Sequence, residues 1–164
     1  MGNDRVPDWE IVAFEPDNLG HRDAFRLLNL AWIEEHFFVE SEDRKYLYHP
    51  EVILETGGQI FMAEDRRSEK DEVLGTCALI VHSDGTFELS KMGVAPQAQR
   101  RGIGDALCRA VIEAAREQGA REVVLMSNTI LEPAIRLYHR LGFKTVPIEK
   151  SDYERANIKM VLEL

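Results

Sequence analysis

Residues 88–105, E-L-S-K-M-G-V-A-P-Q-A-Q-R-R-G-I-G-D, combine the residue types of an anion-binding loop. An apolar repeat with helical spacing follows the two glycines, so a helix should begin there. The N-terminus of a helix carries unpaired backbone N–H groups and the positive end of a dipole, and glycine lets a bulky anion approach them. The sequence therefore predicts a phosphate-binding loop. Its residues are Gln99, Arg100, Arg101, Gly102, Ile103 and Gly104.

The loop does not match the two commonest nucleotide motifs. A P-loop needs G-x-x-x-x-G-K-[ST], but no Lys-Ser or Lys-Thr follows these glycines. The dinucleotide fingerprint G-x-G-x-x-G needs a third glycine where this chain has Leu107. The pattern that fits is Q/R-x-x-G-x-G/A, and taken alone it also fits a helix preceded by a glycine-rich turn.

Two segments together resemble one family. The loop follows a strand that ends in V-x-P at Val94 and Pro96, and in this setting it resembles the pyrophosphate loop of the GNAT acyltransferases, the GCN5-related N-acetyltransferases. Residues 134–143, A-I-R-L-Y-H-R-L-G-F, are similar to the closing helix and turn of that family. The resemblance implies a single domain over residues 1–164.

The resemblance implies acetyl-CoA as the acyl donor. The backbone N–H groups of residues 100–104, with arginine support, are expected to bind its diphosphate, and the strand edge at residues 92–94 its pantetheine arm. The Val94 N–H is expected to donate to the thioester oxygen. The cofactor-binding residues carried over are Met92, Gly93, Val94, Gln99, Arg100, Arg101, Gly102, Ile103, Gly104, Asn128, Leu131, Ala134 and Tyr138.

Three positions depart from the family pattern. Many members have Asn three residues before the alanine that stands at Ala134, and this chain has Leu131 there. Asn128 lies nearby but out of phase. The carboxylate of Asp105 would repel a diphosphate unless it turns outward.

The resemblance also indicates catalytic residues. Glu88 matches the position of a proposed general base, although it could be an edge-strand carboxylate facing water, with Ser90 and a chain of water molecules as rivals. Tyr138 lies on the expected inward face of its helix. It could be a core tyrosine, but the resemblance favours a role in protonating the leaving CoA thiolate.

The acceptor site is marked more weakly. Residues 32–44 are rich in glutamate and aromatics, which also fits a solvated acidic helix end, and the polar segment 149–160 also fits a solvated loop. In the resembling family both regions cover the acceptor. The acceptor-site candidates are Trp32, Glu35, His36, Tyr153, Arg155 and Asn157.

Composition limits the class of partner. The chain has 164 residues, enough for one domain with a core, and a net charge of −9, which argues against nucleic-acid binding and mildly favours an amine-bearing substrate. Cys77 and Cys108 are isolated, as in a reducing cytoplasm, and no apolar run has membrane-spanning length. A cytoplasmic location without metal is expected, and exposed sheet edges make a homodimer plausible.

Turn signals and periodicity predict an α/β (α+β mixed) fold: a central mixed, mostly antiparallel sheet of six or seven strands with helices on both faces. Strands are predicted at about residues 10–14, 59–64, 73–82, 86–94, 121–127, 143–146 and 156–164. Helices are predicted at about residues 18–37, within 43–57, and at about 104–118 and 131–141.

The expected function is transfer of an acetyl group from acetyl-CoA to a primary amine on an acceptor that the sequence does not identify. Two other classes stay open: a domain that senses acyl-CoA without catalysis, and a nucleotide-binding regulator. A sensor would not need both a base such as Glu88 and an acid such as Tyr138.

Overall fold

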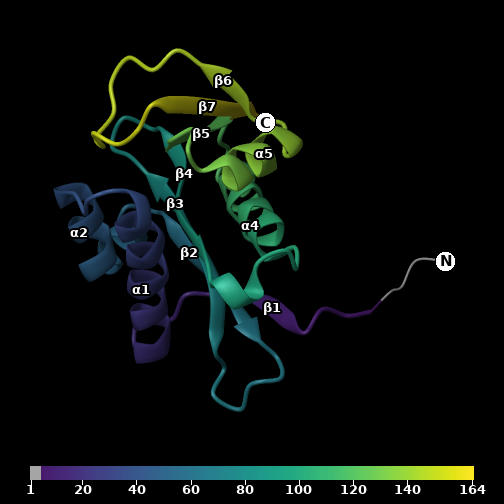
Figure 1. Cartoon of the computed structure of the whole chain (residues 1–164). Coiled ribbons are helices and arrows are strands. Elements are labelled where there is room, and N and C mark those ends of the chain that lie inside the picture. Colours follow the sequence, from purple (N-terminus) through teal and green to yellow (C-terminus); the bar gives the residue numbers. More distant parts are fainter. Residues whose placement is uncertain (1–4) are drawn as a thin grey trace.

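A computed structural model describes residues 5–164, and the strands in this range form one seven-stranded sheet in the order β1-β2-β3-β4-β5-β7-β6 (Figure 1). Neighbouring strands run antiparallel except β4 and β5, so the predicted fold class is confirmed. The strands are β1 Trp9–Ala13, β2 Gln59–Asp65, β3 Val73–Val81, β4 Phe87–Val94, β5 Glu122–Ser127, β6 Lys144–Val146 and β7 Ile158–Glu163.

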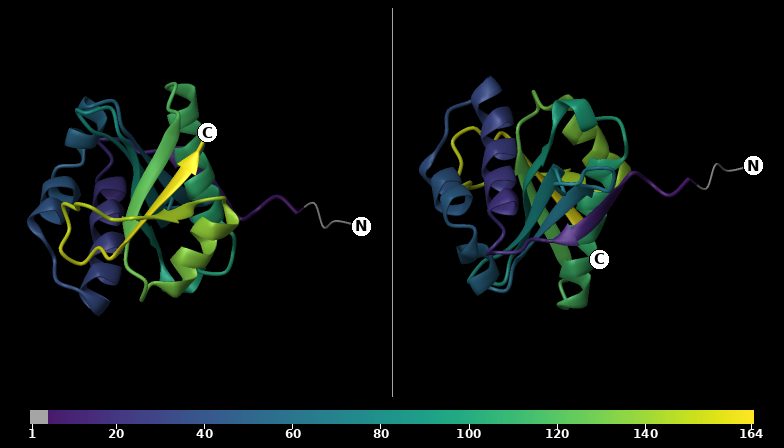
Figure 2. Two further views of the ribbon diagram at one scale, coloured as in Figure 1. Left: turned by 90° about the horizontal axis from the view of Figure 1, so that it is seen from above. Right: turned by 90° about the horizontal axis from the view of Figure 1, so that it is seen from below.

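Helices cover both faces of the sheet. The helices are α1 Leu19–His36, α2 Ser41–Tyr48, α3 Glu51–Glu55, α4 Ile103–Glu117 and α5 Glu132–Arg140, with a 3-10 turn η1 at Pro96–Ala98. The views from above and below place α1, α2 and α3 on one side and α4 and α5 on the other (Figure 2). Each layer encloses its own apolar cluster, and β3, covered on both faces, is buried from Leu74 to Ile80.

The sheet opens between β4 and β5. These parallel strands share a single residue pair, Glu88 with Val124, whereas the other edge of β5 pairs with β7 along its whole length. A β-bulge lies just beyond this pair, where Lys91 and Met92 of β4 together oppose Cys77 of β3. Lys91 takes a left-handed backbone conformation, with a φ of 55°, that side chains other than glycine rarely adopt.

The bulge leaves one edge of β4 open. The N–H of Ala95 donates to the Leu74 carbonyl of β3 at 2.8 Å. Successive N–H groups of a strand point to opposite sides. The Val94 N–H therefore points away from β3, toward the gap that faces β5.

The described part of the chain contains no helix that is both long and apolar enough to cross a membrane.

Candidate active site

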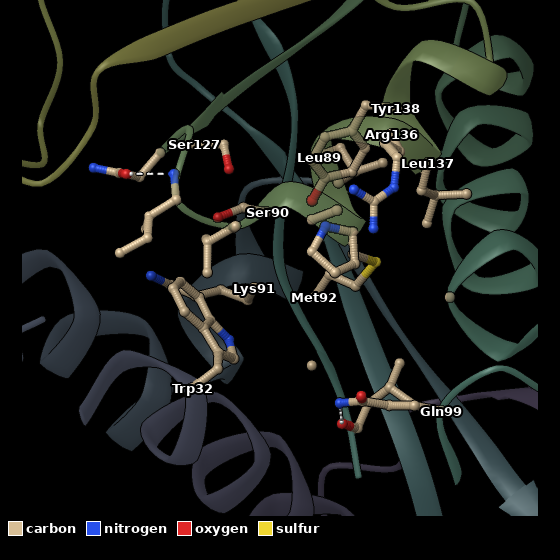
Figure 3. A pocket seen from close by; sticks show the side chains of 18 of the residues that line it. Trp32, Leu89, Ser90, Lys91, Met92, Gln99, Ser127, Arg136, Leu137 and Tyr138 are labelled. Atoms are coloured by element: carbon tan, nitrogen blue, oxygen red, sulfur yellow. Dashed lines mark hydrogen bonds between the residues drawn. The ribbon is translucent and has the colours of Figure 1, made fainter. Parts of the chain in front are cut away.

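A cavity of about 650 Å³ occupies the gap between β4 and β5. Figure 3 shows Trp32 and Lys91 on one side of it and Arg136, Leu137 and Tyr138 of α5 on the other. The cavity lining includes nearly all the site residues predicted from the sequence; Arg101 and Asn157 do not line it. The diverging strands thus bring the glycine loop, the two catalytic candidates and the acceptor candidates to one place.

The glycine loop forms the cradle of unpaired N–H groups that its composition predicts. Arg100 and Gly102 both have left-handed backbones, with φ of 64° and 80°, and Gly102 caps the N-terminus of α4. Among residues 5–164, no acceptor receives the N–H groups of residues 103–105; the N–H of Ala106 is the first in α4 to find one, the Gly102 carbonyl. Backbone N–H groups in such a turn make a concave anion site.

A side chain at Gly104 would enter the space at the mouth of this cradle. A Cβ built there would lie 3.4 Å from Leu137 Cδ2 and within 4 Å of Met92 and Val94 side-chain atoms, all of them on cavity-lining residues. The residues present therefore suit a diphosphate, whose oxygens need close access to the backbone.

The charges around the cradle are arranged differently from the sequence expectation. Arg101 lies off the cavity, where its charge helps to lower the pKa of Asp65 behind the hydrogen bonds from Arg67. Its part in anion binding stays a prediction. The cavity is instead lined by the arginine side chains of Arg100, Arg136 and Arg140.

Asp105 is neutralised by a neighbour. Its carboxylate accepts a hydrogen bond of 2.7 Å from the Arg109 guanidinium one turn along α4, and its side chain is 39% exposed. The repulsion that the sequence suggests is therefore reduced by pairing with Arg109, although Asp105 still lines the cavity.

Glu88 is buried beside the cavity and does not face water. Only 9% of the residue is exposed, and one carboxylate oxygen lies 2.6 Å from Nε2 of His82. It also lines the cavity, so it can meet a substrate there. The interpretation as a solvated edge carboxylate does not hold in this structure.

Tyr138 is a buried tyrosine whose hydroxyl opens on the cavity. Its ring packs edge-on against Phe143 at 5.9 Å between centroids. Within the described residues, every fully buried side-chain oxygen or nitrogen has a hydrogen-bond partner, whereas the Tyr138 hydroxyl makes no hydrogen bond. The hydroxyl is therefore not fully buried, and Figure 3 shows it pointing into the cavity. Burial, and less strongly Cys108 and Cys77, raises the pKa of Tyr138, so the hydroxyl stays protonated at neutral pH.

The end of α1 lines the side of the cavity at which the sequence predicts the acceptor. Trp32, Glu35 and His36 all line it, together with Tyr153 from the segment between β6 and β7. Trp32 is fixed because its indole N–H donates to the Asn29 side chain at 2.9 Å, whereas Glu35 and His36 are exposed. The cavity lining thus combines aromatic rings with the carboxylates of Glu35 and Glu88.

Arg155 anchors these aromatic rings from inside. Its guanidinium donates to both carboxylate oxygens of Asp43 at 2.6 and 2.7 Å and lies 3.3 Å from Glu40. It also packs between the Trp32 ring at 5.3 Å and the Tyr153 ring at 4.6 Å. Binding of an acceptor carboxylate by Arg155 stays a prediction, since its hydrogen bonds already serve the protein.

Lys91 completes a buried charge cluster that we define as Lys91, Asp43, Arg155 and Glu40. The Lys91 ammonium donates to Asp43 at 2.6 Å, with side-chain exposures of 2% and 0%, and lies 4.4 Å from the centre of the Tyr153 ring. The cluster joins the bulge of β4 to α2 and to the segment before β7. It therefore fixes three elements that surround the acceptor side.

The cluster changes the acidity of its members. Burial alone would raise the pKa of Asp43, but the hydrogen bonds from Arg155 and the charge of Lys91 outweigh it and lower that pKa to about 2. Burial also lowers the pKa of Lys91, and the attraction of Asp43 opposes this only in part.

The two asparagine candidates bond within the protein. The Asn128 amide donates to the Arg155 carbonyl at 2.7 Å and accepts from the Ile130 N–H at 2.9 Å. Asn157 accepts from the Thr129 N–H at 2.9 Å, at the outer surface. Both stabilise the loop after β5, and their contacts with a ligand stay predictions, as do those of Leu131 and Ala134, which line the cavity.

Sequence reasoning missed Lys91, Asp43 and His82. One signal was present: Ser90 and Lys91 are consecutive polar residues in an otherwise alternating strand, which is how a bulge disturbs a strand pattern. The partners of Lys91 and Glu88 come from other elements, so no comparable sequence signal indicates them.

The comparisons with known proteins agree with this geometry. Residues 56–145 match the model of the acetyltransferase (GNAT) domain, which is more than half of the chain. The chain therefore belongs to the GNAT acetyltransferase family.

Individual relatives are more distant. Mouse N-acetyltransferase 8 is 34% identical over 92 residues, covering 56% of this chain and 37% of that protein. The chain spans between about a third and just over half of the length of the curated relatives that it matches.

The fold is shared with solved structures. An acetyltransferase from Streptococcus agalactiae 2603 matches with a TM-score of 0.81 at 22% identity, over 97% of this chain and 100% of that chain. A protein from Salmonella typhimurium described as an acetyltransferase, solved with its cofactor acetyl-CoA, matches with a TM-score of 0.69 at 18% identity, over 95% and 94%.

The buried cluster makes a prediction about stability. Asp43→Asn should lower the free energy of unfolding by about 3 kcal/mol or more, because it leaves Lys91 as a buried charge without a counter-ion. Urea unfolding measures this. The matched control is Asp23→Asn, whose carboxylate pairs with Arg26 at the surface and should change stability by less than about 0.5 kcal/mol. Equal effects in the two variants would contradict the role of the cluster.

The same carboxylate makes a prediction about acid stability. The folded pKa of Asp43, about 2, lies below its ordinary value of 3.8. Its contribution, about 2 kcal/mol, is present above pH 4 and is lost as the pH falls through 2. Unfolding curves between pH 5 and pH 2 should therefore fall less steeply for Asp43→Asn than for the wild type. Parallel curves would show that Asp43 is not the group concerned.

Proposed function

We propose that this chain is an acetyl-CoA-dependent N-acetyltransferase that transfers the acetyl group directly to a primary amine. The observation that carries the proposal is the meeting, in one cavity, of the N–H cradle at residues 103–105 and the open edge of β4. Glu88 and Tyr138 line the same cavity. Membership of the GNAT family supports this reading.

Different residues bind the diphosphate and the pantetheine arm of the cofactor. The N–H groups of residues 103–105, at the positive end of the α4 dipole, hold the diphosphate, and Arg100 adds positive charge. The open edge of β4 at residues 92–94 offers strand-like hydrogen bonds to the amides of the pantetheine arm. When bound, acetyl-CoA supplies an activated thioester.

The protein then provides three functions at the reacting atoms. The Val94 N–H donates to the thioester oxygen, where negative charge develops. The Glu88 carboxylate takes a proton from the acceptor ammonium, since only the neutral amine is a nucleophile. The Tyr138 hydroxyl, kept protonated by burial, gives its proton to the departing thiolate.

The acceptor is proposed only as a class. An amine cation suits a cavity lined by Glu35, Glu88 and Trp32, because carboxylates and aromatic faces both attract cations. The nature of the group that carries the amine, the preferred acyl chain, a homodimeric state and a cytoplasmic location stay predictions. Among the described residues, no group of three or more potential ligands is placed to hold a metal ion.

The rival reading is a domain that binds acyl-CoA without turnover. Thermal-shift screening with acetyl-CoA, CoA, ATP and NAD, followed by thiol-release assays over an amine library, separates the two. The proposal predicts stabilisation by CoA species and thiol release with at least one amine. Stabilisation by CoA without thiol release would favour the sensor, and stabilisation by ATP alone would reject both readings.

Two substitutions in the cradle should change CoA affinity in opposite directions. Gly104→Asp should weaken CoA binding by at least about tenfold, because a carboxylate would enter the diphosphate site. Asp105→Asn should tighten binding by about two- to fivefold, because it removes a negative charge beside that site. Isothermal titration calorimetry with CoA measures both.

Glu113→Gln is the control, because this residue lies on the same helix and pairs with Arg116 away from the cavity. It should leave CoA affinity unchanged. Unchanged affinity in Gly104→Asp, with the fold intact, would show that the diphosphate binds elsewhere.

Substitution of the acid and the base should slow turnover without loss of CoA binding. Glu88→Gln and Tyr138→Phe should each lower kcat by about a hundredfold, as expected when a general base or acid is lost. The controls are Glu10→Gln on β1 and Tyr48→Phe on α2, an exposed carboxylate and an exposed tyrosine. Rates of acetyl-CoA consumption with a responsive amine measure the effect. Wild-type rates in Glu88→Gln or Tyr138→Phe would remove that residue from the mechanism.

A further inference from the structure

His82 lies directly behind the carboxylate that the proposed function uses as its base. Its Nε2 is 2.6 Å from Glu88 Oε1, and the side chains are 28% and 11% exposed. Glu88 lines the cavity and His82 does not. One face of the carboxylate therefore meets the substrate while the other is bound to an imidazole that reaches solvent.

The backbone fixes this pairing. Glu88 pairs with Ile80 across the β3–β4 ladder, so His82, two residues further along, is a diagonal neighbour on the same face. The turn after β3 is closed by the His82 N–H donating to the Thr86 carbonyl at 2.9 Å, and by the Gly85 N–H donating to the His82 carbonyl. The imidazole is thus positioned by the hairpin itself.

The charges facing His82 are all acidic. Glu88 on β4, Asp84 in the turn and Asp152 in the segment before β7 each raise the pKa of His82, with the hydrogen bond to Glu88 contributing most and burial opposing it. The charge of Glu88 also raises the pKa values of Tyr46 and Tyr153 and opposes the lowering of the pKa of Lys91. The pKa of His82 therefore lies above its ordinary value of 6.5, and the imidazole is protonated at pH values below that pKa.

The protonation state of the imidazole decides what Glu88 can do. A neutral imidazole donates its Nε2–H to Oε1 and leaves Oε2 free to take a proton from the acceptor. An imidazolium carries a full positive charge beside the carboxylate, which makes Glu88 a weaker proton acceptor and repels an ammonium substrate. Turnover should therefore rise as the pH rises through the titration of His82.

We propose that His82 is a positioning residue that orients Glu88 for proton transfer and suppresses its action as a base when the imidazole becomes charged. The inference rests on the proposed role of Glu88 as the base. In the step concerned, the acceptor ammonium loses one proton to Oε2 of Glu88, and its nitrogen then forms the new C–N bond with the thioester carbon. As the C–S bond breaks, its electron pair passes to sulfur, which takes a proton from Tyr138. The second proton, which the nitrogen loses as the amide forms, returns to the tyrosine oxygen.

The kinetic test compares His82→Gln with His82→Ala. Gln keeps an N–H donor but does not titrate, whereas Ala removes the donor as well. With acetyl-CoA and 2-phenylethylamine as the probe amine, kcat is measured from pH 5.5 to pH 9. We expect the rising limb of the wild type to vanish in His82→Gln, with a rate at pH 8.5 within about threefold of the wild type. His82→Ala should be slowed about tenfold at that pH.

A matched control is His49→Gln. His49 also lies near a glutamate, Glu51, but 66% of its side chain is exposed and it does not line the cavity. Its pH profile should equal that of the wild type. A rising limb that persists unchanged in His82→Gln would overturn the inference.

A second measurement needs no acceptor. The ring of His82 is titrated by NMR in the wild type and in Glu88→Gln, with CoA present and absent. We expect a pKa above 6.5 in the wild type that falls toward 6.5 in the variant. An unchanged pKa would show that Glu88 and His82 are uncoupled and would overturn the inference even if the probe amine is not turned over.

The two proposals fail in different ways. A normal rate in Glu88→Gln removes the base and the proposed mechanism, whatever His82 does. A rate lost in Glu88→Gln, together with an unaltered pH profile in His82→Gln, removes only the inference about His82.

Discussion

The site depends on the parting of β4 from β5. After the single pair at Glu88, the bulge at Lys91 turns β4 away and leaves its edge unpaired. A left-handed lysine costs about 1–3 kcal/mol and persists only where surrounding contacts hold it. The buried ion pair with Asp43 and the ring of Tyr153 supply those contacts. The strain at this point is therefore tied to the opening in which the proposed chemistry takes place.

The two ends of the cavity differ in their electrostatics. At the loop, the N–H groups of residues 103–105 have no acceptor among the described residues, so they are free to bind an anion, and arginines line the cavity. At the acceptor end, buried cations and carboxylates neutralise one another within the Lys91 and Asp43 cluster. Glu88 is paired instead with an imidazole that titrates. The proposed anionic donor and cationic acceptor would thus be attracted to different ends of the cavity, in a protein whose net charge is −9.

The sequence predicted the architecture well, because the signals of strands, turns and helices are local. Turn residues and periodicity placed every strand and helix to within a few residues, and the glycine loop needed only its own backbone. Contacts between distant segments were not predictable in this way. The sequence suggests Arg155 as a ligand contact because nothing nearby in sequence shows that it binds Asp43. Arg100 and Arg101 are equivalent in the sequence pattern, but in the structure only Arg100 lines the cavity. The partnership of Glu88 with His82 likewise depends on strand register.

The central claim is that the open edge of β4 and the N–H groups of residues 103–105 together bind the acyl carrier. The most direct measurement is a crystal structure of the chain soaked with CoA. The account predicts the diphosphate against the N-terminus of α4, and pantetheine amides hydrogen-bonded to the backbone of residues 92–94. A CoA molecule bound elsewhere, with both sets of backbone groups still free, would contradict it.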